Sequence, residues 1–184
     1  MIGTFTLPLG SVFTGQPEVI DSTVLTATAA SVRFSFSPIY RLILLTGFDT
    51  YNAYGYETIR LNKDSGANYC TTTIRADGGS LAAPQTANDT AFSATGTSIF
   101  ANTGGMNPVV IVSKPSANAK AMITYQSALQ QSGGAGDIKS VTSTGLWSNT
   151  ADLLYSIDIV AASYSSSSPV MSIGSSFTLW GYRL

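Results

Sequence analysis

The 184 residues fit the size of one domain, and 44% of them are hydrophobic, which is enough for one sizeable core. Only 10% are charged, and nine Lys and Arg nearly balance ten Asp and Glu, so no basic field exists that would attract a nucleic acid. The chain has no histidine, the usual general base and a common metal ligand. We therefore expect a non-enzymatic protein without cofactor or metal, whose neutral, hydroxyl-rich surface favours assembly over free diffusion.

Nothing in the chain indicates secretion or membrane insertion. The first residues, MIGTFTLPLGSVF, have neither a positive start nor a continuous apolar stretch. No segment approaches the roughly 18 apolar residues of a membrane span. The single cysteine, Cys70, cannot form a disulfide within the chain and is expected to be a small buried residue. We expect synthesis in the cytoplasm and no membrane partner.

Apolar residues recur with a period of two or in short runs bounded by Gly, Pro, Asn, Asp or Ser, which is typical of an all-β protein. The predicted strands are 4–7, 19–27, 31–37, 40–46, 56–61, 67–74, 98–101, 109–113, 119–126, 141–147, 153–161 and 176–182. The predicted loops are 77–96, 102–108 and 130–136, and the serine-rich stretch 163–169 is interpreted as a flexible connection. The most helix-like segment, 117–131, is better interpreted as a strand with a polar extension.

Side-chain alternation indicates how these strands pack. Residues 155–160 alternate between apolar and more polar side chains, as in a sandwich of two antiparallel sheets. Residues 177–182 carry apolar side chains on both faces, so we expect that strand to be an edge strand covered by a neighbour. We predict an N-terminal arm or strand-exchange segment over 1–30 and a β-sandwich domain over 31–184.

A cluster of turn-forming residues separates two of the predicted strands. Asn62, Asp64, Gly66 and Asn68 tolerate left-handed backbone or hydrogen-bond their own backbone, as a tight turn requires. Side-chain oxygen atoms of Asn62, Asp64, Ser65 and Asn68 could in principle hold calcium. However, only one of these groups is a carboxylate, and no acidic residue stands at the twelfth position of an EF-hand loop. A structural turn is the favoured interpretation.

Three tyrosines, Tyr51, Tyr54 and Tyr56, form the most conspicuous candidate for an interface or a glycan contact, because tyrosine offers a large contact area and a hydroxyl group. Ordinary packing at a strand end is the alternative, and the more frequent one. Paired acids of the glycosidase type are not indicated, because Asp49, Glu57, Asp64 and Asp77 are scattered in the sequence and nothing places two of them at a catalytic separation.

Four stretches resemble, in order, a pattern found in jelly-roll virion proteins of tailed bacteriophages. They are FSFSPIYRLILL (34–45), LNKDSGANY (61–69), GLWSNTADLLYSIDIVAAS (145–163) and IGSSFTLWGYRL (173–184). The similarity extends over residues 34–184, and it departs from the pattern at Lys63 and Trp180, where Gly and Tyr are more frequent.

The resemblance implies a jelly-roll fold, a place in the virion and assembly as a homotrimer. We expect a capsid decoration, cement or head-fibre protein on the capsid surface, with the major capsid protein or another virion protein as its partner. A tail-fibre, tail-adaptor or receptor-binding module that contacts a host surface glycan is the alternative. A depolymerising tail spike fits poorly, because such proteins are long β-helices with regular turns.

Overall fold

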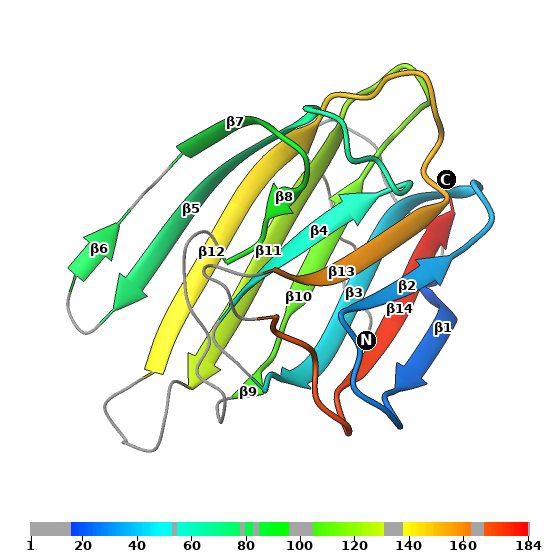
Figure 1. Ribbon diagram of the computed structural model, residues 1–184. Coiled ribbons are helices and arrows are strands. Elements are labelled where there is room, and N and C mark those ends of the chain that lie inside the picture. Colours follow the sequence, from blue (N-terminus) through cyan, green and yellow to red (C-terminus); the bar gives the residue numbers. More distant parts are fainter. Residues whose placement is uncertain are drawn as a thin grey trace.

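The computed structural model describes residues 16–52, 55–77, 80–82, 85–95, 105–130, 138–162 and 168–183. These ranges contain β-strands and no helix, and so no helix that could cross a membrane. The strands form two antiparallel sheets of ten and four strands that pack face to face (Figure 1).

The larger sheet has the order β1-β14-β3-β10-β11-β12-β5-β6, with β7 also paired to β5 and β9 to β3 and β11. Its strands are β1 (Glu18–Val24), β3 (Tyr40–Thr50), β5 (Tyr69–Asp77), β6 (Ser80–Ala82), β7 (Gln85–Asp89), β9 (Gly105–Met106), β10 (Val109–Ser113), β11 (Ala121–Gln130), β12 (Ile138–Trp147) and β14 (Ser176–Arg183).

The smaller sheet lies in front of the larger one in Figure 1 and has the order β2-β13-β4-β8. Its strands are β2 (Ser31–Ser35), β4 (Tyr56–Leu61), β8 (Phe92–Ser93) and β13 (Ser156–Ala162). The central strand, β13, pairs with β2 on one side and β4 on the other, so its residues Ile157 and Ile159 face the core from the middle of the sheet.

The core fills the space between the sheets with side chains from both. Trp147, Tyr69 and Phe34 are buried there with the aliphatic residues Ile43 and Leu45. Each large apolar side chain that is fully buried contributes about 1.5–3 kcal/mol, so this one cluster dominates the stability of the sandwich.

The chain crosses repeatedly from one sheet to the other. It does so from β1 to β2, β2 to β3, β3 to β4, β4 to β5, β7 to β8, β8 to β9, β12 to β13 and β13 to β14. As a result, strands far apart in the sequence become neighbours, which is the path of a jelly roll. The fold class predicted from the sequence, an all-β sandwich of two antiparallel sheets, is confirmed.

The structure corrects three expectations about the elements. Residues 18–24 of the predicted arm form β1, which pairs with β14 of the same chain, while residues 1–15 lie outside the described ranges. The predicted loop 77–96 contains β6, β7 and β8, and the predicted loop 102–108 contains β9. The strand β14 is not an edge strand, because it lies between β1 and β3.

Candidate interaction surface

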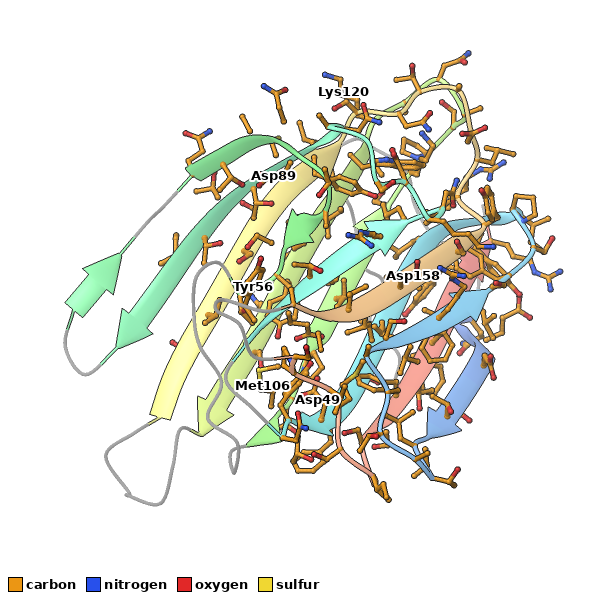
Figure 2. All side chains as sticks on the ribbon, viewed as in Figure 1. Asp49, Tyr56, Asp89, Met106, Lys120 and Asp158 are labelled. Atoms are coloured by element: carbon orange, nitrogen blue, oxygen red, sulfur yellow. The ribbon has the colours of Figure 1, made fainter. Side chains whose placement is uncertain are left out.

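The structure describes two of the three tyrosines predicted as an interface or glycan contact. Tyr51 is only 1% exposed and belongs to the core, so its side chain offers no contact to a glycan or a partner. Tyr56 is half-buried at the start of β4 and packs against the core (Figure 2). Tyr54 lies outside the described residues. Packing therefore accounts for both described members of the predicted patch.

The predicted turn residues lie between β4 and β5, where they reverse the chain. Asn62 and Lys63 have left-handed backbone, with φ of 55° and 62°. The Asp64 backbone N–H donates to the Leu61 carbonyl, and the Asp64 carboxylate accepts from the Gly66 N–H at 2.8 Å and from Asn68 Nδ2 at 2.9 Å. The acid thus closes the turn on itself, the arrangement that Asp and Asn favour in turns.

Asp64 also connects this turn to the far end of β12. The indole N–H of Trp147 donates to Asp64 Oδ2 at 2.6 Å. Partial burial alone would raise the pKa of the Asp64 carboxyl, but the hydrogen bonds from Trp147, Gly66 and Asn68 hold it below its ordinary value. The carboxylate is fully used by protein donors, so the turn has a structural explanation without calcium.

Asn62 joins the same turn to the entrance of β13. Its Nδ2 donates to the Leu153 carbonyl at 2.7 Å, and its Oδ1 accepts from the backbone N–H groups of Tyr155 and Ser156 at 2.8 and 3.1 Å. The side chain therefore replaces sheet partners that residues 153–155 lack. The predicted turn is a fixed corner of the sandwich.

Two buried carboxyl groups, which the sequence did not bring together, lie between the sheets. Asp49 on β3 and Glu57 on β4 are both 0% exposed. The Tyr51 hydroxyl donates to Asp49 Oδ2 at 2.8 Å, and the Tyr125 hydroxyl on β11 donates to Glu57 Oε2 at 2.7 Å. The second oxygen of each carboxyl, Asp49 Oδ1 and Glu57 Oε1, has no hydrogen-bond partner. We call Asp49 and Glu57 the buried acid pair.

Burial determines the protonation of this pair. It raises the pKa of Asp49 to about 7, although the Tyr51 hydrogen bond acts in the opposite direction. Burial, reinforced by the nearby charge of Asp49, raises the pKa of Glu57 well above its usual range. The pair therefore carries protons at pH values where exposed carboxyl groups are ionised.

The buried acid pair is poorly placed for chemistry on a substrate. Paired acids in glycosidases act on a sugar that lies between them, whereas neither of these side chains is accessible from outside. Among the described residues, no group of three His, Cys, Asp or Glu side chains could hold a metal ion. Glu57 is best understood as a polar contact between the two sheets, because its hydrogen bond with Tyr125 joins β4 to β11, whereas Asp49 is bonded to Tyr51 two residues along the chain.

The alternation of inward and outward side chains along each strand could have indicated these two acids from the sequence. In β4, Glu57 shares its face with Ile59 and Leu61, and both of these are buried. In β3, Asp49 shares its face with Leu45. An acid at an inward position of a strand is the signal of a buried carboxyl, but which acid meets which depends on the sandwich.

The outer face of the larger sheet is the side turned away from β2, β4, β8 and β13. Strand register places its side chains in three rows across the sheet. The central row is Val19, Trp180, Leu44, Ile111, Thr124, Thr144, Thr72 and Gln85. The flanking rows are Tyr182, Leu42, Ser113, Met122, Leu146, Cys70 and Ala87, and Ser22, Thr178, Thr46, Val109, Gln126, Thr142 and Ile74.

These three rows, which we call the uncharged face, contain no Asp, Glu, Lys or Arg. Several of their large apolar residues are open to solvent: Met122 is 55% exposed, Val19 54% and Ile74 50%. Trp180 and Leu44 beside them are half-buried. Val19, Trp180, Leu44 and Ile111 are successive neighbours in the central row, and a contiguous apolar patch of this kind is typical of an interaction site.

Charged side chains lie in other places. Arg33 and Asp158 form an ion pair on the outer side of the smaller sheet, with Nε and Oδ1 2.5 Å apart. Glu18 and Arg183 pair at the β1 edge of the larger sheet, with Nε and Oε1 2.6 Å apart. The described charged pairs thus lie outside the three rows of the uncharged face.

A shallow depression of about 390 Å³ opens on the uncharged face beside β10, β11 and β12. Its lining includes Asn107, Gln126, Ser140 and Thr142, whose amide and hydroxyl groups suit polar ligands, and Val109. It contains no aromatic ring on which a sugar could stack.

Fold and surface together define a β-sandwich with one uncharged, partly apolar sheet face. No family model matches the chain, and comparisons with curated proteins and with solved structures return no match. This surface and the sequence pattern are the features of the chain that bear on its function.

Proposed function

We propose that this chain is a non-enzymatic structural protein of a tailed bacteriophage virion. In this proposal it is a capsid decoration, cement or head-fibre protein that binds the outer capsid as a homotrimer and stabilises it. The major capsid protein or another virion protein is its partner, and neither nucleic acid nor membrane takes part.

The observation that carries the proposal is the uncharged face. Interfaces lack charged residues at their centre and are enriched in aromatic residues and Met, and Trp180, Tyr182 and Met122 lie on this face. A protein that stays in a fixed assembly can keep such a surface covered, whereas a freely diffusing one would expose it. The inaccessible buried acid pair supports a role without catalysis.

The resemblance supplies the virion context. All four segments contain corners or central strands of the sandwich: 34–45 contains the first part of β3, 61–69 is the Asp64 turn, 145–163 contains β13, and 173–184 contains β14. Repeated copies that each make modest contacts with neighbouring capsomers would oppose internal pressure through summed binding.

Labelling of intact virions tests the proposal. Gold-tagged antibody against this protein should bind densely over the head in electron micrographs, and particles that lack the protein should lose their DNA at lower temperature. Labelling confined to the tail would contradict the capsid location, and no labelling of any particle would contradict the virion role.

The receptor-binding alternative has one observation in its favour, the depression with its amide and hydroxyl lining. A panel of host surface glycans, tested with wild type and with Gln126→Ala, would measure it. Binding that Gln126→Ala weakens would favour this alternative over capsid decoration.

A further inference from the structure

We propose that the uncharged face is the contact between copies of this chain, with the faces of three copies meeting around a common threefold axis. The inference rests on the proposed function and deepens it, because it names the surface that forms the homotrimer.

The chemistry of the face determines which partner fits it. A charged partner would lose hydration on contact and find no opposite charge among the three rows. A partner with an equally neutral mixture of apolar and hydroxyl groups loses little, and its threonines can exchange hydrogen bonds with Thr124 and Thr144. Another copy of this chain presents such a surface in the same rows.

The size of the face also suits a stable protein contact. Each residue on one face of a sheet occupies about 4.8 Å across the strands and about 7 Å along them, so the 22 residues of the three rows cover about 700 Å². Stable interfaces bury about 800 Å² on each partner. The uncharged face is therefore large enough to hold subunits together without further contacts.

The β1 edge of the larger sheet is a poorer place for subunits to join. The pairing of β1 with β14 shifts register between Val19 and Asp21, which is a bulge, and Glu18 and Asp21 bring acids to this edge. Bulges and charges are the devices by which proteins block pairing at a sheet edge. The uncharged face is therefore better suited to a contact between subunits than the β1 edge is.

Light scattering on the purified chain tests the inference, because one chain has a mass of 19.2 kDa. Wild type should have a mass of three chains, and the double variant Ile111→Lys/Met122→Lys should fall to the mass of one. Both residues are exposed, by 38% and 55%, so the variant should fold, which circular dichroism checks. Ile173→Lys is the matched control, because Ile173 is 66% exposed in a turn outside the three rows, and it should stay a trimer.

Several results would overturn the inference. One is a double variant that folds and keeps the wild-type mass, since the contact would then lie elsewhere. A wild-type protein that is monomeric at every concentration would also overturn the inference. If removal of residues 2–15 then caused association, the N-terminal segment of the same chain would be the occupant of the face.

Virion labelling separates the inference from the function on which it rests. A monomeric wild type that still labels the capsid, and whose double variant no longer does, would leave the proposed function standing and make another virion protein the occupant. A trimeric wild type that labels no virion would support the contact and contradict the proposed function.

Discussion

The buried acid pair makes the stability of this protein depend on pH in an unusual direction. Because burial raises the pKa of Asp49, the folded state binds a proton that the unfolded chain releases at lower pH. The corresponding stability is fully present below the unfolded pKa of 3.8 and is lost as the pH rises through the folded pKa of about 7. Replacing Asp49 by Asn removes this titration and keeps an oxygen that can accept from Tyr51.

The expected magnitude follows from the shift. Three pKa units at about 1.4 kcal/mol each give a loss of about 4 kcal/mol from wild type between pH 4 and pH 8. The new amide N–H groups of Asn find few acceptors in the core, which costs about 1–3 kcal/mol at every pH. Asp49→Asn should therefore be less stable than wild type by about 1–3 kcal/mol at pH 4 and more stable by a similar amount at pH 8.

Urea unfolding at fixed protein concentration, followed by the fluorescence of Trp147 and Trp180, measures this crossover. The pH dependence that remains in the variant should come from Glu57, and it should shrink further in Asp49→Asn/Glu57→Gln. Asp21→Asn, at an exposed acid, is the matched control and should follow wild type. Parallel stability curves for wild type and Asp49→Asn from pH 4 to pH 8 would refute the reasoning.

Three further substitutions test the corners of the sandwich, each by urea unfolding. Asp64→Ala should lower the free energy of unfolding by about 1–3 kcal/mol at neutral pH, because it leaves the Trp147 indole N–H without its acceptor. The difference from wild type should shrink as the pH falls through the lowered pKa of Asp64. An equal loss of stability at pH 2 and pH 7 would contradict this prediction. Lys63→Gly should stabilise by up to about 1 kcal/mol, because Lys63 has a φ of 62°, and a loss of stability would show that its side chain matters more than its backbone. Gly145→Ala should destabilise by more than about 3 kcal/mol, since its Cβ would overlap the Cys70 carbonyl, and a neutral effect would mean that β5 and β12 can separate there.

The sequence predicts the regular strands well where residues that favour strands are flanked by residues that favour turns. Strands 56–61 and 109–113 match β4 and β10 at both ends, because both are rich in β-branched or aromatic residues and have turn-forming residues beside them. By contrast, β7 consists of QTAND, which is polar and mostly exposed. Pairing with β5 makes it a strand, and such a partner cannot be recognised from the local residues.

The entrance to β13 shows how a side chain can change a boundary. The apolar pattern predicts a strand from residue 153, whereas β13 begins at Ser156. The intervening backbone is hydrogen-bonded by the Asn62 side chain, from more than 90 residues earlier in the chain. A period-two pattern reports which side chains are apolar, not which group accepts the backbone hydrogen bonds.

The two candidate sites differ in how far the sequence could predict them. The Asn62–Asn68 turn is local, so its residues alone indicate it. The uncharged face is not local, because Val19, Leu44 and Trp180 become neighbours only through the order of the strands. At Tyr51 ordinary packing is the interpretation that holds, and the local residues alone do not indicate whether this side chain lies in the core or on the surface.

The position of β14 between β1 and β3 has a consequence for synthesis. β1 pairs with β14 alone in the larger sheet, and Glu18 lies opposite Gly181. Until residues 176–183 have left the ribosome, β1 has no partner and β3 has one open side. The sandwich must therefore close after translation of nearly the whole described chain, by slow long-range pairing. A nascent chain stalled before residue 176 should remain sensitive to protease.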